Sequence, residues 1–414
     1  MENEVLVVGG GVAGGSAILS LHNAGYKVTL VSSDPLVYSK MTLSYALKRR
    51  VTSIDPYVIF RPEDLKQLNV DFINDSVVYI DPDNRVIRTK SGSIIEFDNL
   101  VLATGSRIAA PHIEGIELKG VYTFLSFEDV VELDRVATHG RRAVIVGAGM
   151  IGLLAADSLY SRGLDVTLID ILPYPLMTAV EERIARIMLE RLTARGVRFL
   201  GNSIVERIEG FGRVEQVVLA TGDKIPADIV IISTGVRANV PEGLERLVEG
   251  PGNSVLTDEF FRTKMKNIYA IGDCASSIDY ITERKVYRPL GIIASYEARL
   301  LPRALKGLSY RGFIPYQVEE AFGYYFIRLG LNGFEARRLG VSYSTALIEY
   351  KVPGLYILRS LVIYERGSGR VIGWQSIGPS MVSYKSKIFE DIIRAGGSLE
   401  DIQEKKIRIV CENC

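Results

Sequence analysis

The chain has 414 residues, a length that suggests two to four domains of ordinary size. Its 49 basic residues balance its 49 acidic residues, which argues against nucleic acid or an anionic membrane surface as the main partner. Only three cysteines and three histidines are present; these counts exclude a disulfide framework, favour a cytoplasmic location and make a bound metal unexpected.

The uncharged segment from Val5 to Tyr26 resembles a membrane span by hydropathy alone. It contains six glycines and several polar side chains, which a helix facing lipid would not favour. The chain opens Met1-Glu2-Asn3-Glu4 and lacks the basic start of a secretory signal. We therefore expect no transmembrane segment.

The first predicted unit is a strand, a glycine-rich turn, a helix and a second strand. It reads Val5–Val8, then Gly9-Gly10-Gly11-Val12-Ala13-Gly14, a helix to about Ala24 that ends at Gly25, and the strand Val28–Val31. The position after the second strand, where an NAD site has an acid, holds Ser32, and Asp34 follows two residues later. This unit predicts a dinucleotide site that is not a standard NAD site.

The same order of elements occurs a second time. It reads Ala143–Val146, then Gly147-Ala148-Gly149-Met150-Ile151-Gly152, a helix to about Arg162 that ends at Gly163, and the strand Val166–Ile169. In both units, 16 positions separate the first motif glycine from the glycine that ends the helix. Asp170 follows the second strand, where an acid hydrogen-bonds the adenosine ribose and repels a 2′-phosphate, so NADH is favoured over NADPH. A solvated acid at a strand end is the alternative interpretation.

Each glycine of a G-x-G-x-x-G motif has a mechanical role. The first makes the tight turn, the second lets the backbone approach a pyrophosphate, and the third lets the helix pack on the strand. The start of the helix then faces the phosphates. Two such motifs, each between a strand and a helix, predict two dinucleotide sites.

Three further strands end in recognisable residues. These are Leu100–Leu102 before Ala103-Thr104-Gly105, Ile229–Ile232 before Ser233-Thr234-Gly235, and Ile268–Ala270 before Ile271-Gly272-Asp273.

The C-terminal part reads as an α+β module. We expect short alternating strands from Tyr325 to Ile377, with turns at Gly330–Gly333, Pro353–Gly354 and Gly367–Gly369. Helical patterns follow at Val382–Arg394 and Ser398–Glu404. The apolar faces of this module favour a homodimer interface over a substrate pocket.

The order of these motifs resembles the pyridine nucleotide–disulfide oxidoreductase superfamily of flavoproteins over nearly the whole chain. The resemblance implies an α/β fold with two Rossmann-like three-layer domains and a C-terminal α+β dimerisation domain. The expected ranges are 1–113 and 245–318 for the discontinuous FAD domain, 114–244 for the inserted NAD domain, and 319–414 for the dimerisation domain.

The resemblance also implies two sets of cofactor-binding residues. Those expected for FAD are Gly9, Gly11, Val12, Ala13, Gly14, Ser33, Asp34, Lys40, Val77, Ala103, Thr104, Gly105 and Asp273. Those expected for NAD are Gly147, Gly149, Met150, Ile151, Gly152, Asp170, Thr234 and Gly235. In the superfamily, the acid corresponding to Asp273 binds the FAD ribityl chain; a helix N-cap is the simpler interpretation of this residue.

Two subfamilies are resembled at different ends of the chain. The segment 33–44, with Asp34, Tyr38 and Lys40, is similar to rubredoxin, ferredoxin and nitrite reductase flavoproteins, in which the cation contacts the FAD phosphates or adenine side. Segments 330–340 and 369–373 are similar to NADH oxidases and coenzyme A disulfide reductases, which implies a homodimer.

The chain departs from these relatives where their chemistry uses side chains. Their redox cysteine would fall at Met41 or Thr42, neither of which can form a thiolate. A glutamate–lysine ion pair near the flavin is replaced by Leu154 and Tyr45, which puts efficient NADH use in question.

The chain ends in a Cys-x-x-Cys pair, Cys411 and Cys414. A frayed end with inert cysteines, a redox dithiol, and half of a metal site completed in a dimer are the three interpretations.

We therefore expect an FAD-dependent NAD(P)H oxidoreductase in which hydride passes to the flavin without a catalytic side chain. The acceptor is a small redox protein, a quinone or dye, or oxygen. The alternatives are a disulfide or polysulfide reductase that uses Cys411 and Cys414 as an auxiliary dithiol, a regulatory flavoprotein, and a subunit of a larger dehydrogenase.

Overall fold

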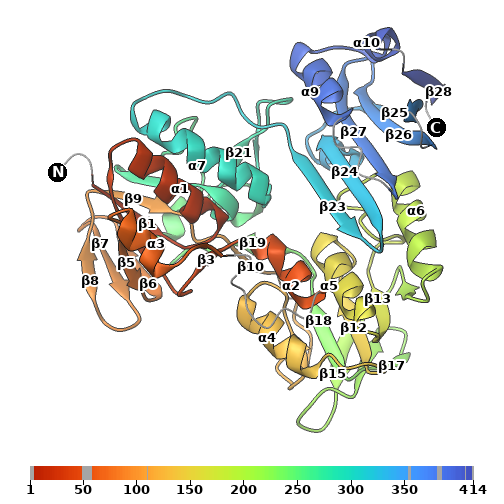
Figure 1. The fold of residues 1–414 in the computed structure, drawn as a ribbon, viewed down its shortest axis with the longest axis horizontal. Helices are drawn as coiled ribbons and strands as arrows, with labels where there is room; N and C mark the ends of the chain where they lie inside the picture. The colour runs from red at the N-terminus through yellow and green to blue at the C-terminus, as the bar shows by residue number, and fades with distance from the viewer. Residues whose placement is uncertain are drawn as a thin grey trace.

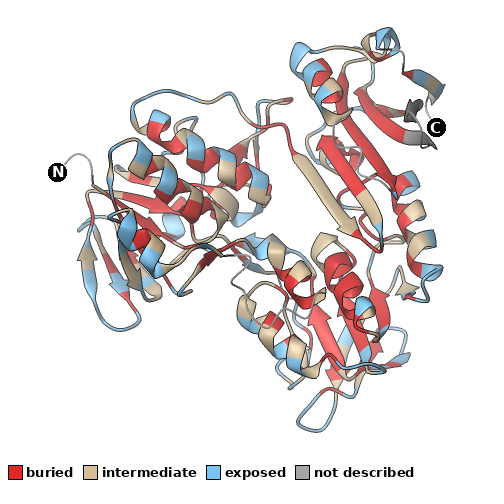
Figure 2. Ribbon diagram, viewed as in Figure 1, coloured by how far each residue is buried: buried red, intermediate tan, exposed pale blue. Residues whose placement is uncertain are grey.

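The computed structural model describes residues 4–48, 58–109, 111–352, 356–379, 385–405 and 407–412. Its elements form three units (Figure 1). In each unit the buried residues concentrate in the sheet, and the surrounding helices expose their outer faces (Figure 2).

The first unit is built on a five-stranded parallel sheet in the order β20-β9-β1-β2-β5. The strands are β1 (Glu4–Val8), β2 (Lys27–Ser32), β5 (Asp71–Asn74), β9 (Asn99–Leu102) and β20 (Ile268–Ala270). Helices α1 (Val12–Asn23) and α7 (Gly291–Leu305) pack against each other. A three-stranded antiparallel sheet adds β6 (Val77–Asp81), β7 (Val86–Thr89) and β8 (Ile94–Glu96). Because β20 and α7 come from much later in the chain, this unit is discontinuous, as predicted.

The second unit repeats the plan with a parallel sheet in the order β11-β18-β12-β13-β14. The strands are β11 (Val121–Tyr122), β12 (Arg142–Val146), β13 (Asp165–Ile169), β14 (Arg198–Leu200) and β18 (Ile229–Ile232). Its helices are α4 (Phe127–Val136), α5 (Met150–Ser161) and α6 (Glu182–Thr193). A small antiparallel sheet contains β15 (Val205–Glu209), β16 (Gln216–Leu219) and β17 (Lys224–Pro226).

Two strands connect the first and second units. They are β10 (Ser106–Ile108), on the way out, and β19 (Val236–Ala238), on the return, and they pair antiparallel. These strands lie shortly before the domain boundaries predicted at 114 and 244. The exact positions of the two boundaries remain predictions.

The third unit contains a six-stranded antiparallel sheet in the order β23-β24-β27-β26-β25-β28. The strands are β23 (Tyr316–Ala321), β24 (Tyr324–Gly330), β25 (Tyr343–Val352), β26 (Tyr356–Glu365), β27 (Val371–Gly378) and β28 (Arg408–Glu412). Helix α9 (Ser386–Ala395) covers one face, where the rings of Trp374 and Phe389 stack 4.6 Å apart. The sheet begins at Tyr316, three residues before the boundary predicted at 319.

One expectation for this unit was wrong, and so was one of the three interpretations of the chain end. The stretch predicted as strands and turns contains helix α8 (Gly333–Arg338), because the Asn332 side chain accepts a hydrogen bond from Glu335 N and caps it. The chain end is part of the sheet as far as Glu412, because β28 pairs with β25. It is therefore not frayed over these residues. The Cys411 side chain, Cys414, the turn at Pro353–Gly354 and residues 381–384 lie outside the described parts.

The other helical predictions agree with the structure over its described residues. Helix α10 (Leu399–Glu404) begins after Ser398, whose side chain accepts a hydrogen bond from Glu400 N. No helix in the described ranges is long and apolar enough to cross a membrane. The predicted architecture, two Rossmann-like units plus an α+β unit, is confirmed.

Candidate active site

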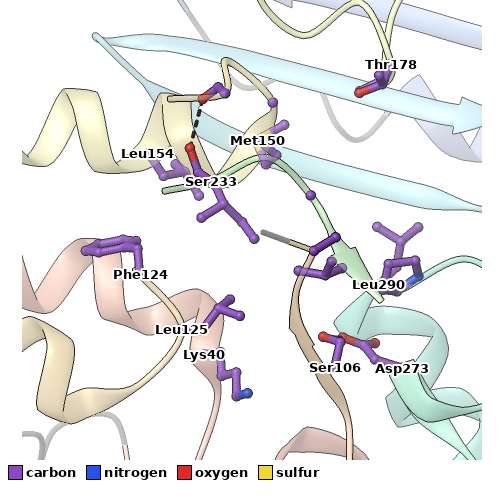
Figure 3. Close-up of a pocket in the computed structure, with 18 of the residues that line it drawn as sticks. Lys40, Ser106, Phe124, Leu125, Met150, Leu154, Thr178, Ser233, Asp273 and Leu290 are labelled. Atoms are coloured by element: carbon purple, nitrogen blue, oxygen red, sulfur yellow. Dashed lines mark hydrogen bonds between the residues drawn. The ribbon is translucent and has the colours of Figure 1, made fainter. Parts of the chain in front are cut away.

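A cavity of about 1240 Å³ is lined by residues of all three units. In Figure 3, Met150 and Leu154 lie on one side of an open space. Ser106, Asp273 and Leu290 lie across from them. The predicted residues that line the cavity are Gly11, Val12, Ala13, Lys40, Ala103, Gly105, Asp273, Gly147, Gly149, Met150, Ile151, Asp170, Thr234 and Gly235.

The three motif glycines of the first unit have different surroundings. Gly9 has φ +109°, and a Cβ there would lie 2.3 Å from the Ala103 carbonyl oxygen. A Cβ on Gly14 would lie 1.9 Å from the Gly9 carbonyl oxygen. A Cβ on Gly11 would meet no atom within 4 Å. The fold itself therefore requires the first and third glycines, whereas the second faces open space at the start of α1.

The second unit reproduces this arrangement. Gly147 has φ +103° and a Cβ there would approach the Ser233 carbonyl oxygen to 2.4 Å, while a Cβ on Gly152 would lie 1.9 Å from the Gly147 oxygen. A Cβ on Gly149 would again meet nothing within 4 Å. The Ser233 hydroxyl is 2.8 Å from the Gly147 oxygen and donates a hydrogen bond to it (Figure 3). Each unit thus holds an open turn at a helix start, the geometry that accepts a pyrophosphate.

Asp170 is held against the second glycine turn. Its carboxylate accepts hydrogen bonds from Ala148 N at 2.6 Å and from Leu172 N at 2.8 Å. These contacts fix the acid at the end of β13 on the cavity wall, rather than leaving it as a freely solvated side chain.

Asp273 lies inside a short 3₁₀ helix, Gly272–Cys274, and is not its N-cap, which is Ile271. The Ser106 hydroxyl donates a hydrogen bond to its carboxylate at 3.1 Å. Burial raises the pKa of Asp273, although Ser106 and the Lys40 ammonium oppose that rise. A half-buried acid on the cavity wall, with Ser106 as its hydrogen-bond partner, can accept further hydrogen bonds from a ligand hydroxyl.

Lys40 lies on the cavity wall at the start of the 3₁₀ helix Lys40–Thr42. Burial raises the pKa of Asp34, and Glu128 adds to the rise, while the Lys40 charge opposes it. The Lys40 charge therefore lowers the pKa of both predicted FAD acids, Asp34 and Asp273.

The remaining predicted residues do not line the cavity. Thr104 donates its hydroxyl to the Asn239 carbonyl oxygen at 2.5 Å, and Ser33 accepts from Asn74 through its carbonyl. Val77 begins β6. Gly9, Gly14 and Gly152 act through the backbone contacts given above.

The described residues fit a flavin dinucleotide and a nicotinamide dinucleotide. Two open glycine turns face one cavity, the half-buried Asp273 lines the same cavity, and most of the cavity lining is apolar. Bound there, FAD would supply hydride and electron transfer. Gly11, Gly149, Asp170 and Asp273 are the residues that would hold the two dinucleotides.

Several residues of the wall were missed from the sequence. Ser106 directly follows Ala-Thr-Gly, and Leu290 and Gly291 form the start of α7, so glycines at strand ends and helix starts were available signals. Glu319 on β23 also lines the cavity, and no local pattern indicated it.

Relatives have a glutamate–lysine ion pair at the positions of Leu154 and Tyr45. This chain has an ion pair one helical turn further along the same two helices. Leu154 is buried on the cavity wall. Three residues after Tyr45 and after Leu154, Lys48 Nζ lies 2.7 Å from Asp157 Oδ2 and 3.4 Å from Glu320 Oε2. Helix α2 (Leu43–Lys48), α5 and β23 are therefore tied together away from the glycine turns.

No thiol lines the cavity among the side chains that the structure describes. The Thr42 hydroxyl donates to the Ser39 carbonyl oxygen at 2.5 Å, and the Met41 side chain lies outside the described atoms. Cys274 is fully buried behind the sheet, where burial raises the pKa of its thiol to about 11. It is a packing residue, because a reactive cysteine needs a thiolate and access.

Comparisons with known proteins identify the family of the chain. A family described as pyridine nucleotide-disulphide oxidoreductase matches residues 3–289. The chain is 30% identical over 314 residues to an NADH oxidase of Methanocaldococcus jannaschii, covering 73% of this chain and 70% of that one. It is 34% identical over 277 residues to a rubredoxin-NAD(+) reductase of Pseudomonas putida, covering 66% and 71%.

A solved structure is similar over nearly the whole chain. It is an NAD-dependent persulfide reductase from A. fulgidus, with a TM-score of 0.89 and 28% identity, covering 96% of this chain and 78% of that one.

Proposed function

The chain belongs to the pyridine nucleotide-disulphide oxidoreductase family, and from this premise we propose that it is an NADH-dependent flavoprotein reductase whose electrons leave without a protein thiol. The observation that supports this proposal is the cavity with two open glycine turns and, among its described walls, no cysteine. Asp170 supports NADH over NADPH, because its held carboxylate would repel a 2′-phosphate.

A small redox protein is the acceptor we favour. The segment 33–44 resembles rubredoxin and ferredoxin reductases, and the relative with 34% identity is named a rubredoxin reductase. One-electron protein acceptors need only an approach to the flavin edge, whereas disulfide acceptors need a nucleophilic thiol. We further propose a cytoplasmic homodimer joined through the third unit, on the resemblance of segments 330–340 and 369–373.

An acceptor panel tests the proposal. Under anaerobic conditions, NADH should support fast reduction of rubredoxin or a [2Fe–2S] ferredoxin and slower reduction of a quinone, and prior alkylation with iodoacetamide should not slow the protein acceptors. If only disulfides or polysulfide were reduced, and alkylation stopped that reduction, the proposal would be wrong.

A polysulfide or disulfide reductase is the second candidate. It is favoured by the similarity of 96% of the chain to the persulfide reductase, and it would require Cys411 and Cys414 as the dithiol. The variant Cys411→Ser/Cys414→Ser should then lose polysulfide reduction while flavin reduction by NADH persists. Unchanged polysulfide turnover would reject this candidate.

A further inference from the structure

Glu319 is an acid on the wall of the cavity that the mechanism above does not use. It lies in β23, and its strand neighbours Gln317 and Val318 line the cavity with it. Among the described residues, no hydrogen bond or ion pair involves its carboxyl group. By contrast, the adjacent Glu320 contacts Lys48 Nζ at 3.4 Å and accepts a hydrogen bond from Gly323 N at 3.0 Å.

The position of Glu319 relates to the missing ion pair. Leu154 of α5 supplies an apolar part of the wall where relatives have a glutamate, and Tyr45, on the helix α2 that contacts α5, is half-buried. Burial raises the pKa of Tyr45, and the charge of Glu319 adds to that rise. Helix α5 contacts both α2, which carries Tyr45, and β23, which carries Glu319. The cavity thus has no carboxyl group at position 154 of α5, but it has one at Glu319 of β23, the strand that contacts α5.

Other charged and titratable groups surround this wall. On the neighbouring elements of the described chain they are Tyr45 and Lys48 of α2, Asp157 of α5, Tyr325 and Arg328 of β24, and Glu320 of β23 itself. Lys48 is engaged by Asp157 and Glu320, and Arg328 by Glu335. The cations near Glu319 are therefore already neutralised by other acids.

We propose that Glu319 is the carboxyl group of the nicotinamide site and that it makes this site discriminate between the cationic ring of NAD⁺ and the neutral ring of the reduced form. This inference rests on the proposed function. Hydride transfer moves one proton with two electrons and leaves a cationic ring, so Glu319 exchanges no atom and acts only through its charge.

The charge of Glu319 changes near neutral pH. Burial raises the pKa of its carboxyl group to about 7. Below that pH the acid is neutral and has no preference for a cationic ring, and above it the carboxylate attracts NAD⁺. Oxidised dinucleotide is therefore held more tightly as the pH rises, while the reduced form is nearly unaffected.

Binding to the oxidised holoenzyme tests this proposal without turnover. Calorimetric titration from pH 6 to pH 8 would compare NAD⁺ with 1,4,5,6-tetrahydro-NAD, which has a neutral ring and donates no hydride. We expect the NAD⁺ dissociation constant to fall roughly tenfold over this range. The tetrahydro form should change less than about twofold, because its ring lacks the charge.

Two matched variants separate charge from structure. Glu319→Gln imitates the neutral acid and should bind NAD⁺ at every pH as the wild type does at pH 6. Glu320→Gln changes the neighbouring acid and should keep the pH dependence, even if its unfolding temperature falls. A pH dependence that persists in Glu319→Gln would overturn the assignment while leaving the proposed function intact. Failure of the wild type to bind either dinucleotide would overturn both.

Discussion

The middle glycine of each turn provides a direct test of the two dinucleotide sites. Replacing Gly11 with alanine adds a Cβ that meets no protein atom within 4 Å, at a φ of −78° that alanine adopts freely. The only folding cost is at the N-cap of α1, where alanine is less favourable than glycine by about 0.5–1 kcal/mol. The new methyl group instead occupies the space where a pyrophosphate would approach the backbone.

The expected effect on FAD binding follows from that lost approach. Displacing a phosphate from one backbone N–H removes a charge-assisted hydrogen bond, which contributes about 1.5–3 kcal/mol. The FAD dissociation constant of Gly11→Ala should therefore rise by roughly 10- to 150-fold. Quenching of flavin fluorescence on titration of the apoprotein measures it, and circular dichroism checks the fold.

Gly149→Ala is the matched control, because it has the same open environment and the same N-cap position in the second unit. It should bind FAD normally and lose affinity for NAD⁺ instead. Gly14→Ala should fail differently, since its Cβ would lie 1.9 Å from the Gly9 oxygen and the fold itself must shift. The reasoning is refuted if Gly11→Ala binds FAD within twofold of the wild type, or if Gly149→Ala loses FAD equally.

Two further predictions concern acids on or near the cavity. Asp170→Asn keeps an acceptor oxygen for the glycine turn but removes the negative charge. The ratio of kcat/KM for NADH to that for NADPH should therefore fall at least about tenfold. The control Asp165→Asn, at the exposed start of the same strand, should leave this ratio unchanged. Glu297 is fully buried, and burial raises its pKa to about 8, so the folded state retains a proton that the unfolded state loses above its ordinary pKa. The unfolding temperature of the wild type, relative to that of Glu297→Gln, should fall as the pH rises from about 5 to 8 and stay level above about pH 8. A difference in unfolding temperature that is constant from about pH 5 to 8 would contradict the raised pKa of Glu297.

The sequence predicted the two parallel units well because their signals are local. Each G-x-G-x-x-G motif lies between a buried strand and a helix, and glycines at Gly25 and Gly163 mark where those helices end. Helix α8 was missed because its six residues are specified mainly by the Asn332 cap, inside a stretch that otherwise alternates like strands.

The cavity was only partly predictable. The glycine turns, Asp170 and Asp273 follow strands directly, so their place at the sheet edge could be expected. The Lys48–Asp157 ion pair links α2 to α5, which lie more than a hundred residues apart in the sequence. Glu319 of β23 lines the cavity with residues that are equally distant in the sequence, such as Leu154 of α5. Only the folded arrangement of β23, α2 and α5 brings such side chains together, and no spacing in the sequence encodes it.

The most direct test of the central claim is an anaerobic titration of the purified holoenzyme with NADH, followed by the visible absorbance of the flavin. If the electrons stop at the flavin, we predict complete bleaching at about one NADH per FAD, because one hydride supplies both electrons that the flavin accepts. Absence of bleaching would contradict NADH use, and consumption of about two NADH per FAD would show a second redox centre, such as a dithiol, within the chain.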